Sequence, residues 1–268
     1  MSYAERGTYI ASHYSLRHRV VARVSQSLDG VTYTVRRGLL KGLRRRGGLA
    51  FVPSWLWRDA PKPEERFLAA LELRGQTVYD VGGFHGLMTL FFATRAAHVV
   101  VYEPNAESRA RIEENVRLNG LTNVTIRPVG LGVERQELDL VFDPRMPGGA
   151  SADPAISAQI GAGERRRITV LPLDTELETE RLPPPDFVKI DVEGMEVGVL
   201  RGMRRLLRTH HPALYIEMHG PDMTAKQANA RAVLTELADA GYTSVLHVES
   251  GATVVDDVIA AQGHLYAS

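Results

Sequence analysis

The sequence predicts an α/β fold in which a mostly parallel sheet is covered by helices on both faces. Short apolar runs of the kind found in buried strands alternate with helix-like stretches along residues 61–268. The clearest unit is residues 77–104, where a strand ending at Asp80 leads through a glycine-rich turn and an apolar helix to a second strand that ends at Glu103. Polar residues also follow later strands, and an open α/β sheet binds its ligand at those ends.

Local signals set the limits of the other elements. Prolines and acidic residues open the first helix, and Asn119-Gly120 closes the charged helix that follows the second strand. Pro212 and Gly241 follow two later helices. The helices are expected at residues 64–73, 193–208 and 224–240, with one more after each of the first two strands. The strands are expected at residues 77–80, 98–102, 123–128, 186–191, 213–217, 243–248 and 253–255.

One segment departs from this alternation of strands and helices. Residues 137–142 and 167–171 have the alternating pattern of strands, and they flank residues 144–163, which are rich in Gly, Ala, Ser and Pro. A loop of this length in a compact domain is usually functional or mobile. We therefore expect a hairpin-like insertion whose loop, residues 144–163, is a mobile cover over the ligand and the acceptor.

The composition excludes several classes of protein. Hydrophobic residues make up 44% and charged residues 24% of the chain, as in an ordinary globular protein. No apolar run reaches the roughly 18 residues that a membrane span needs. Cysteine is absent, which excludes disulfides, thiolate metal sites and a cysteine nucleophile. The first residues lack the pattern of a secretory signal, so the cytoplasm is the expected location.

Charge is distributed unevenly along the chain. Residues 1–60 contain eleven Lys or Arg and three acids, which leaves 21 basic and 29 acidic residues for the rest. We expect residues 1–60 to be a basic, mainly helical extension that covers the substrate or contacts another subunit, and residues 61–268 to be the ligand-binding domain. Packing of this segment on its own acidic domain or on that of a twin subunit in a homodimer is favoured, and a surface for nucleic acid, anionic lipid or an acidic substrate is the alternative.

The glycine-rich turn favours one class of nucleotide ligand. It reads V-G-G-F-H-G, so Val81 replaces the first glycine of the G-x-G-x-x-G pattern that binds dinucleotides. A carboxylate at Asp80 would repel a pyrophosphate but suits a ligand with an ammonium and a sulfonium, which is S-adenosylmethionine. Glu103 follows Gly83 by 20 positions, the spacing of a ribose acceptor. A dinucleotide and a turn that binds nothing are the alternatives.

Four stretches carry a resemblance to a known family: YDVGGFHG, VYEPN, FVKIDVEGMEVGVLRGM and LYIEMHG. Together they resemble the FkbM family of S-adenosylmethionine-dependent methyltransferases over residues 64–220, and K-I-D-V-E-G-M-E is the most specific part. The resemblance implies a class I methyltransferase (Rossmann-like) fold with a seven-stranded sheet whose last strand is antiparallel. The chain departs from the family pattern D-x-G-A-N-x-G at Gly83 and Phe84, and the lost asparagine removes one polar contact near the donor.

The pattern and the resemblance together give a set of site residues. The residues expected to bind the donor are Asp80, Gly82, Gly83, Phe84, His85, Gly86, Glu103, Pro104, Asn105, Val129, Gly130 and Asp191. The catalytic candidates at the strand ends are His219, Asp191 and Glu217, and Glu193 has the position of a helix cap. His219 is expected to take the acceptor's proton, because an unperturbed imidazole titrates near neutrality. These residues can also gather a divalent cation, but no ligand spacing indicates one and a metal is not favoured.

The resemblance implies an enzyme that methylates a hydroxyl of a small molecule, such as a natural product, a sugar or a glycolipid-type acceptor. One alternative is a nucleic-acid methyltransferase that holds phosphates with the basic segment, although the Asn/Asp-Pro-Pro-aromatic motif of amino-directed base methylation is absent. The other is a non-catalytic donor-binding protein, which the polar strand ends disfavour. The sequence leaves the acceptor open.

Overall fold

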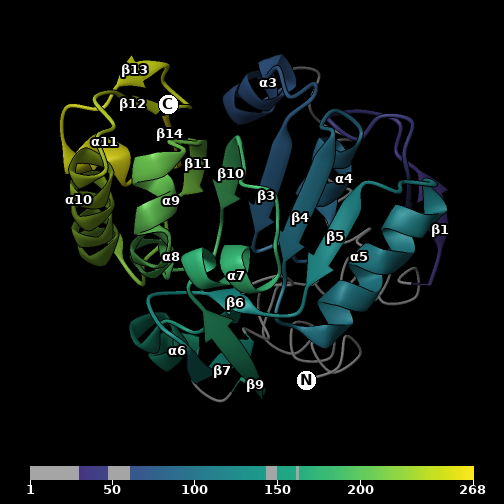
Figure 1. Cartoon of the computed structure of the whole chain (residues 1–268), viewed down its shortest axis with the longest axis horizontal. Coiled ribbons are helices and arrows are strands. Elements are labelled where there is room, and N and C mark those ends of the chain that lie inside the picture. The colour runs from purple at the N-terminus through teal and green to yellow at the C-terminus, as the bar shows by residue number, and fades with distance from the viewer. Residues whose placement is uncertain (1–29, 48–60, 143–149, 161–162) are drawn as a thin grey trace, which may run out of the picture.

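The computed structural model describes residues 30–47, 61–142, 150–160 and 163–268, and shows a central twisted sheet with helices packed around it (Figure 1). Within these residues the sheet has eight strands. From one edge to the other they are β13 (Ala252–Thr253), β12 (Val245–His247), β14 (His264–Ala267), β11 (Ala213–Glu217), β10 (Phe187–Ile190), β3 (Thr77–Val81), β4 (His98–Tyr102) and β5 (Val124–Arg127).

The strand directions confirm the expected fold class. β5, β4, β3, β10 and β11 are parallel, and β14 lies antiparallel between β11 and β12. The seven expected strands are therefore present, and β13 is the strand expected at residues 253–255. The eighth strand is β14, a strand of four residues that the sequence analysis missed. Its register places His264 opposite Glu217.

Two hydrophobic clusters hold the helices on opposite faces of the sheet. Alternate residues of β3 enter different clusters, since Val78 packs in one and Tyr79 in the other. The helices that pack on the Tyr79 side are α7 (Leu173–Thr179), α8 (Glu196–Gly202), α9 (Arg204–Thr209), α10 (Met223–Asp239) and α11 (Asp257–Ala260). The helices that pack on the Val78 side are α3 (Pro63–Ala70), α4 (Leu87–Ala93) and α5 (Ala106–Leu118).

The helix expected at residues 193–208 is two shorter helices. Glu193 and Gly194 have positive φ angles of 51° and 104°, so the chain turns there and α8 begins only at Glu196. Met203, between α8 and α9, has φ −123° and ψ 21°, which is outside the helical region. The turn at Glu193 directs this part of the chain toward the ends of the central strands.

The insertion forms a second, four-stranded sheet. Its order is β6 (Gly130–Leu131), β9 (Arg165–Leu171), β7 (Gln136–Phe142) and β8 (Ala150–Ser151). β7 and β9 pair antiparallel, which confirms the hairpin-like insertion. The described part of residues 144–163 contains β8 and α6 (Pro154–Ile160), so it is structured and not a plain loop; residues 144–149 and 161–162 lie outside the described residues. The small sheet and α6 lie beyond the carboxyl ends of β3, β4 and β5 (Figure 1).

The described part of the basic segment is a hairpin. The sequence predicts mainly helix in residues 1–60, but residues 30–47 contain the antiparallel strands β1 (Thr32–Thr34) and β2 (Arg44–Arg46). An extended backbone allows the Arg46 N–H to donate to the Asn115 side chain of α5, and the Arg44 N–H to donate to the side chain of Asn119, which follows α5, at 2.8 Å each. This hairpin therefore packs on its own domain, as the favoured interpretation predicts; residues 1–29 and 48–60 lie outside the described residues.

None of the helices in the described ranges is both long and apolar enough to cross a bilayer.

Candidate active site

A cavity of about 300 Å³ lies between the carboxyl ends of the central strands and the small sheet. The wall on the side of the central sheet carries the polar groups of the cavity, which come from Glu103, Asn105, Ser108, Asp191 and Glu193. The opposite wall is apolar and includes Leu138, Leu140, Phe142, Ile168 and Val170 of the small sheet. A cavity with one hydrogen-bonding wall and one apolar wall suits a nucleoside.

Close packing explains the glycines of the turn after β3. Gly82 has φ +84°, and a Cβ added there would lie 1.8 Å from the carbonyl oxygen of Asp191. A Cβ on Gly83 would lie 2.2 Å from the Val101 side chain on β4. These contacts bring the turn against β4 and against the chain that follows β10. Phe84 has φ 46°, a conformation that asparagine tolerates better than phenylalanine does, so this position fits the asparagine of the family pattern.

Glu103, at the end of β4, is fixed by two backbone groups. The Phe84 N–H donates to its Oε2 and the Asn105 N–H donates to its Oε1, both at 2.8 Å. Burial raises the pKa of Glu103 to about 7, although the hydrogen bonds from Asn105 and Phe84 lower it. Each carboxylate oxygen retains a second acceptor position, so Glu103 can still bind hydroxyl groups in the cavity.

Asp80 is not among the described residues that line the cavity. Its side chain is fully buried, accepts a hydrogen bond from Thr89 Oγ1 at 2.6 Å and pairs with Lys189 Nζ at 3.3 Å. Lys189 Nζ also lies 3.1 Å from Asp191 Oδ2 and donates to the Gly82 carbonyl oxygen at 3.1 Å. Burial would lower the pKa of Lys189, but Asp191 and Asp80 raise it above its ordinary value, so the ammonium stays charged. Lys189 thus joins the ends of β3 and β10.

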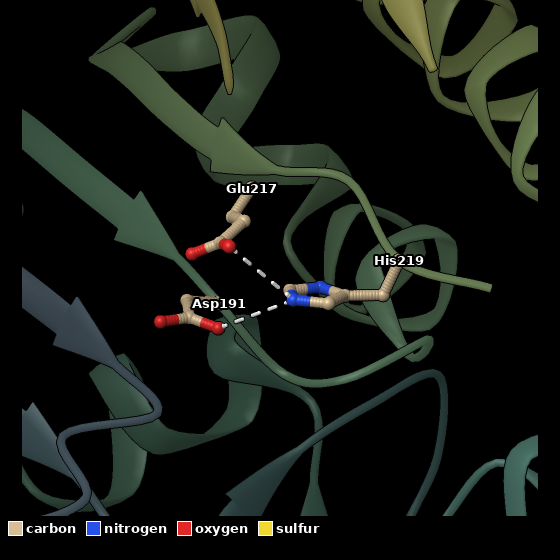
Figure 2. Close-up of side chains that lie close together, drawn as sticks. All are labelled: Asp191, Glu217 and His219. Carbon is tan, nitrogen blue, oxygen red and sulfur yellow. Dashed lines mark ion pairs between the residues drawn. The ribbon is translucent and has the colours of Figure 1, made fainter. Parts of the chain in front are cut away.

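Next to the cavity, Asp191, Glu193 and Glu217 surround His219; we call these four residues the His219 cluster. His219 Nε2 lies 3.8 Å from Asp191 Oδ1, 3.8 Å from Glu193 Oε2 and 3.7 Å from Glu217 Oε1. Figure 2 shows the carboxylates of Asp191, after β10, and Glu217, at the end of β11, directed toward the same edge of the His219 ring. The cluster joins the cavity through Asp191 and Glu193, which line it.

Groups outside the His219 cluster hold its members in place. His219 Nδ1 lies 2.9 Å from Oε1 of Glu196, which is fully buried at the start of α8. Glu196 in turn accepts hydrogen bonds from the Gly194 N–H at 3.0 Å and from Asn229 Nδ2 at 2.7 Å. On the other side, His264 Nε2 lies 3.4 Å from Glu217 Oε2.

The charges of the cluster shift its pKa values in opposite directions. Burial would lower the pKa of His219, but the hydrogen bond to Glu196 and the neighbouring carboxylates raise it to about 9. Burial opposes ionisation of Glu217, but His264 and His219 lower its pKa to about 2. Without a bound cation, the imidazole of His219 is therefore positively charged at neutral pH, which disfavours the role of free base that the sequence analysis gave it.

The structure brings many of the predicted site residues together. The predicted donor contacts that line the cavity are Gly82, Phe84, Glu103, Pro104, Asn105, Gly130 and Asp191. The predicted contacts outside the lining are Asp80, Gly83, His85, Gly86 and Val129. Gly86 begins α4 with φ 79°, and the His85 ring stacks on Phe84 with ring centroids 3.7 Å apart, so both support the turn.

Sequence reasoning missed several residues of the site. Lys189 had a usable signal, because a lysine inside a buried strand needs a charged partner. Glu196, Asn229 and His264 had none, since they lie on three elements that meet only in the fold. Glu193, interpreted as a helix cap, lies in a left-handed turn before the helix and lines the cavity.

The antiparallel β14 beside β11, the glycine turn after β3 and the acid at the end of β4 define a class I methyltransferase fold. A family model described as the methyltransferase FkbM domain matches residues 80–244. The chain therefore belongs to the FkbM methyltransferase family.

Relatives of this chain include two curated methyltransferases. It is 29% identical over 168 residues to the hexuronic acid methyltransferase AglP of Haloferax volcanii, a match that covers 62% of this chain and 66% of that protein. It is 26% identical over 161 residues to methyltransferase 1 of Beauveria bassiana, covering 54% of this chain and 61% of that protein. The matches thus span less than two thirds of either relative.

A solved structure of similar fold is the methyltransferase FkbM from Methylobacillus flagellatus KT. That structure is 15% identical in sequence to this chain, with a TM-score of 0.47. The match covers 98% of this chain and 58% of that one.

Proposed function

We propose that this chain transfers a methyl group from S-adenosylmethionine to a hydroxyl oxygen of a small molecule. The observation that carries the proposal is the position of Asp191, which both lines the cavity and belongs to the His219 cluster. One residue thereby connects a nucleoside-sized cavity to a group of titratable side chains that can act on an acceptor. This supports a site where donor and acceptor meet.

The cavity walls fit the parts of the donor. Glu103 accepts the ribose hydroxyls, and the apolar wall of Leu138, Leu140 and Val170 covers the flat face of the adenine. The methionine end then extends past Gly82 toward Asp191. The carboxylates there suit the ammonium and the sulfonium of the donor.

The reaction needs little covalent assistance from the protein. The acceptor oxygen attacks the methyl carbon, the carbon–sulfur bond breaks, and its electron pair leaves with S-adenosylhomocysteine. The main task of the site is to hold oxygen, carbon and sulfur in line. The hydroxyl proton must also leave, and two of the carboxylates that line the cavity, Asp191 and Glu193, would receive it.

The acceptor class that we propose is supported by one relative. The name of AglP describes a hexuronic acid methyltransferase, and the chain is 29% identical to it over the matched residues. A sugar or another polyhydroxylated small molecule is therefore the acceptor that we propose. In the described basic hairpin, Arg46 of β2 pairs with Glu114 of α5.

Two measurements test the proposal. Calorimetry with S-adenosylhomocysteine and with NAD should show binding of the first compound alone. Incubation with S-adenosylmethionine and a panel of sugars, uronic acids and amines should give a methoxy product with a hydroxylated acceptor, identified by mass spectrometry and proton NMR. Binding of NAD alone would contradict the donor, and methylation of amines alone would contradict the acceptor.

A further inference from the structure

We propose that Asp191, Glu217 and His219 bind one divalent cation of the Mn²⁺ type. The inference rests on the proposed function and deepens it, because a cation at this position would hold the acceptor hydroxyl beside the methyl group. Two carboxylates and one imidazole make a mixed oxygen and nitrogen ligand set. Carboxylates suit Mg²⁺ and Mn²⁺ while imidazole suits later transition metals, so Mn²⁺ should bind more tightly than Mg²⁺.

The spacing of the ligand atoms fits a shared cation. One ligand atom from each of the three residues lies within 4.8 Å of the others, and Nε2 of His219 is 3.7 Å from Glu217 and 3.8 Å from Asp191. These distances are too long for hydrogen bonds. Atoms that share a cation at about 2.1 Å are separated by roughly 3 to 4 Å, and the distances from His219 Nε2 to Asp191 and to Glu217 lie in this range.

Each of the three ligands is anchored through its other polar atom. Asp191 Oδ2 pairs with Lys189 at 3.1 Å, and its Oδ1 faces His219. Glu217 Oε2 pairs with His264 at 3.4 Å, and its Oε1 faces His219. Three inward-facing atoms held from outside form a more rigid site than a patch of mobile surface acids.

The partner of His219 provides a second, independent observation. Its Nδ1 is bonded to Glu196, which is fully buried and belongs to no part of the cation site. Histidines that bind metals commonly donate their other ring N–H to a carboxylate, which fixes the ring and directs the remaining nitrogen at the metal. The Gly194 N–H and Asn229 hold Glu196 in turn, so the ring is oriented by a chain of contacts.

The position of the site gives the cation a role. Glu193 Oε2 lies 3.8 Å from His219 Nε2 and lines the donor cavity, so the open side of the cluster faces the place where the methyl group would lie. A hydroxyl bound to a cation there would lose its proton more easily, because the positive charge stabilises the alkoxide. Glu193 would be the nearest carboxylate to receive that proton.

The test is a titration of the purified full chain, stripped with chelator, with Mn²⁺ and separately with Mg²⁺. Calorimetry and the loss of the free Mn²⁺ resonance signal should both show one site. His219→Ala and Glu217→Gln should each weaken Mn²⁺ binding by about tenfold or more. The matched controls are His210→Ala and Glu178→Gln, which change an exposed histidine and an exposed acid away from the cluster and should leave binding unchanged.

Binding of S-adenosylhomocysteine is measured on the same samples. It reports whether each variant folds, and it separates the two proposals: retained nucleoside binding with no Mn²⁺ binding overturns the cation site alone. Equal Mn²⁺ binding by wild type, His219→Ala and Glu217→Gln also overturns it, because the ion would then lie elsewhere. Mn²⁺ binding that depends on both residues supports the site, even where the nucleoside does not bind and the proposed function fails.

Discussion

We call the turn of Gly82 to Gly86, together with Glu103, the donor half of the site. The donor half and the His219 cluster meet at Asp191, but they are held in place differently. In the donor half, contacts of the backbone hold the residues in position. Gly82 packs against the Asp191 carbonyl group, Gly83 packs against Val101, and two N–H groups donate to Glu103. In the His219 cluster, side chains hold side chains, including Glu196 and His264 from distant elements. We therefore expect changes in the donor half to affect folding and donor affinity together. Changes in the His219 cluster should affect turnover more selectively.

The largest effect should come from Gly82→Ala, which would break the contact between the two regions. The new methyl group would lie 1.8 Å from the Asp191 carbonyl oxygen at a φ of +84°, so the chain after β10 must move. We expect a loss of more than about 3 kcal/mol in unfolding free energy, since overpacking and backbone strain add together. Denaturant unfolding measures this loss.

Gly75→Ala is the matched control for Gly82→Ala. Gly75 has a similar φ of +78°, but a Cβ there meets nothing within 4 Å. Only the strain of the left-handed backbone remains, which costs about 1 kcal/mol. Equal losses of unfolding free energy in the two variants would show that the close approach of Gly82 to Asp191 does not affect stability.

Lys189→Met tests a side chain that contacts both regions, through the Gly82 carbonyl oxygen and the Asp191 carboxylate. It would leave the Asp80 carboxylate fully buried without its cation and would release Asp191 Oδ2. Breaking a buried pair by removing one partner costs about 3–5 kcal/mol. Thermal and denaturant unfolding should both report this loss, together with weaker binding of S-adenosylhomocysteine.

Arg167→Met is the control for the loss of an ion pair. Its partner is Asp139, and the two side chains are 66% and 42% exposed, so the pair contributes less than about 1 kcal/mol. If Lys189→Met is as mild as this control, then the buried lysine does not hold the two strand ends together.

The same contrast explains what the sequence could predict. The donor half lies within residues 80–103 and carries its signal locally, as glycines and an acid at fixed spacing after recognisable strands. β3, β4 and β11 were therefore located closely, and Gly82, Glu103 and Asp191 line the cavity as expected. Asp80, which was also predicted to bind the donor, lies outside the cavity lining and pairs with Lys189 from β10, a contact that its local position at a strand end did not reveal.

The His219 cluster depends on contacts between residues far apart in sequence. Glu196 and Asn229 meet across α8 and α10, and His264 reaches Glu217 only through the register of β14. The sequence periodicities of a strand, 2.0 residues, and of a helix, 3.6 residues, carry no information about such contacts. For the same reason the raised pKa of His219 could not be foreseen, since the carboxylates that cause it, Glu196, Glu193 and Asp191, lie in a segment far from His219 in sequence.

His219→Ala should separate turnover from donor affinity. Whether the imidazole orients the acceptor or binds a cation, its loss removes a group from the acceptor side of Asp191. We expect turnover to fall by about 10²–10⁴-fold. Affinity for S-adenosylhomocysteine, measured by calorimetry, should change little. A parallel fall in donor affinity would show that His219 supports the donor half and that the two regions are not separable.

The smallest effect concerns the pH dependence of donor binding through Glu103. Burial raises its pKa from 4.5 to about 7, so the free protein has this carboxyl largely protonated in mildly acidic buffer. For folding, the raised pKa means that the contribution of Glu103 to stability is greatest at a pH below the pKa of the unfolded chain, and that it is lost as the pH rises through 7.

For binding, the pH dependence has the opposite sign, because the ribose hydroxyls need the ionised carboxylate as acceptor. Affinity for S-adenosylhomocysteine should therefore increase by about tenfold between roughly pH 6 and pH 8. Glu103→Gln should bind more weakly by about 1–3 kcal/mol and lose this pH response, whereas Glu107→Gln, an exposed acid on α5, should keep it. The same slope in wild type and Glu103→Gln would place the titrating group outside the donor half.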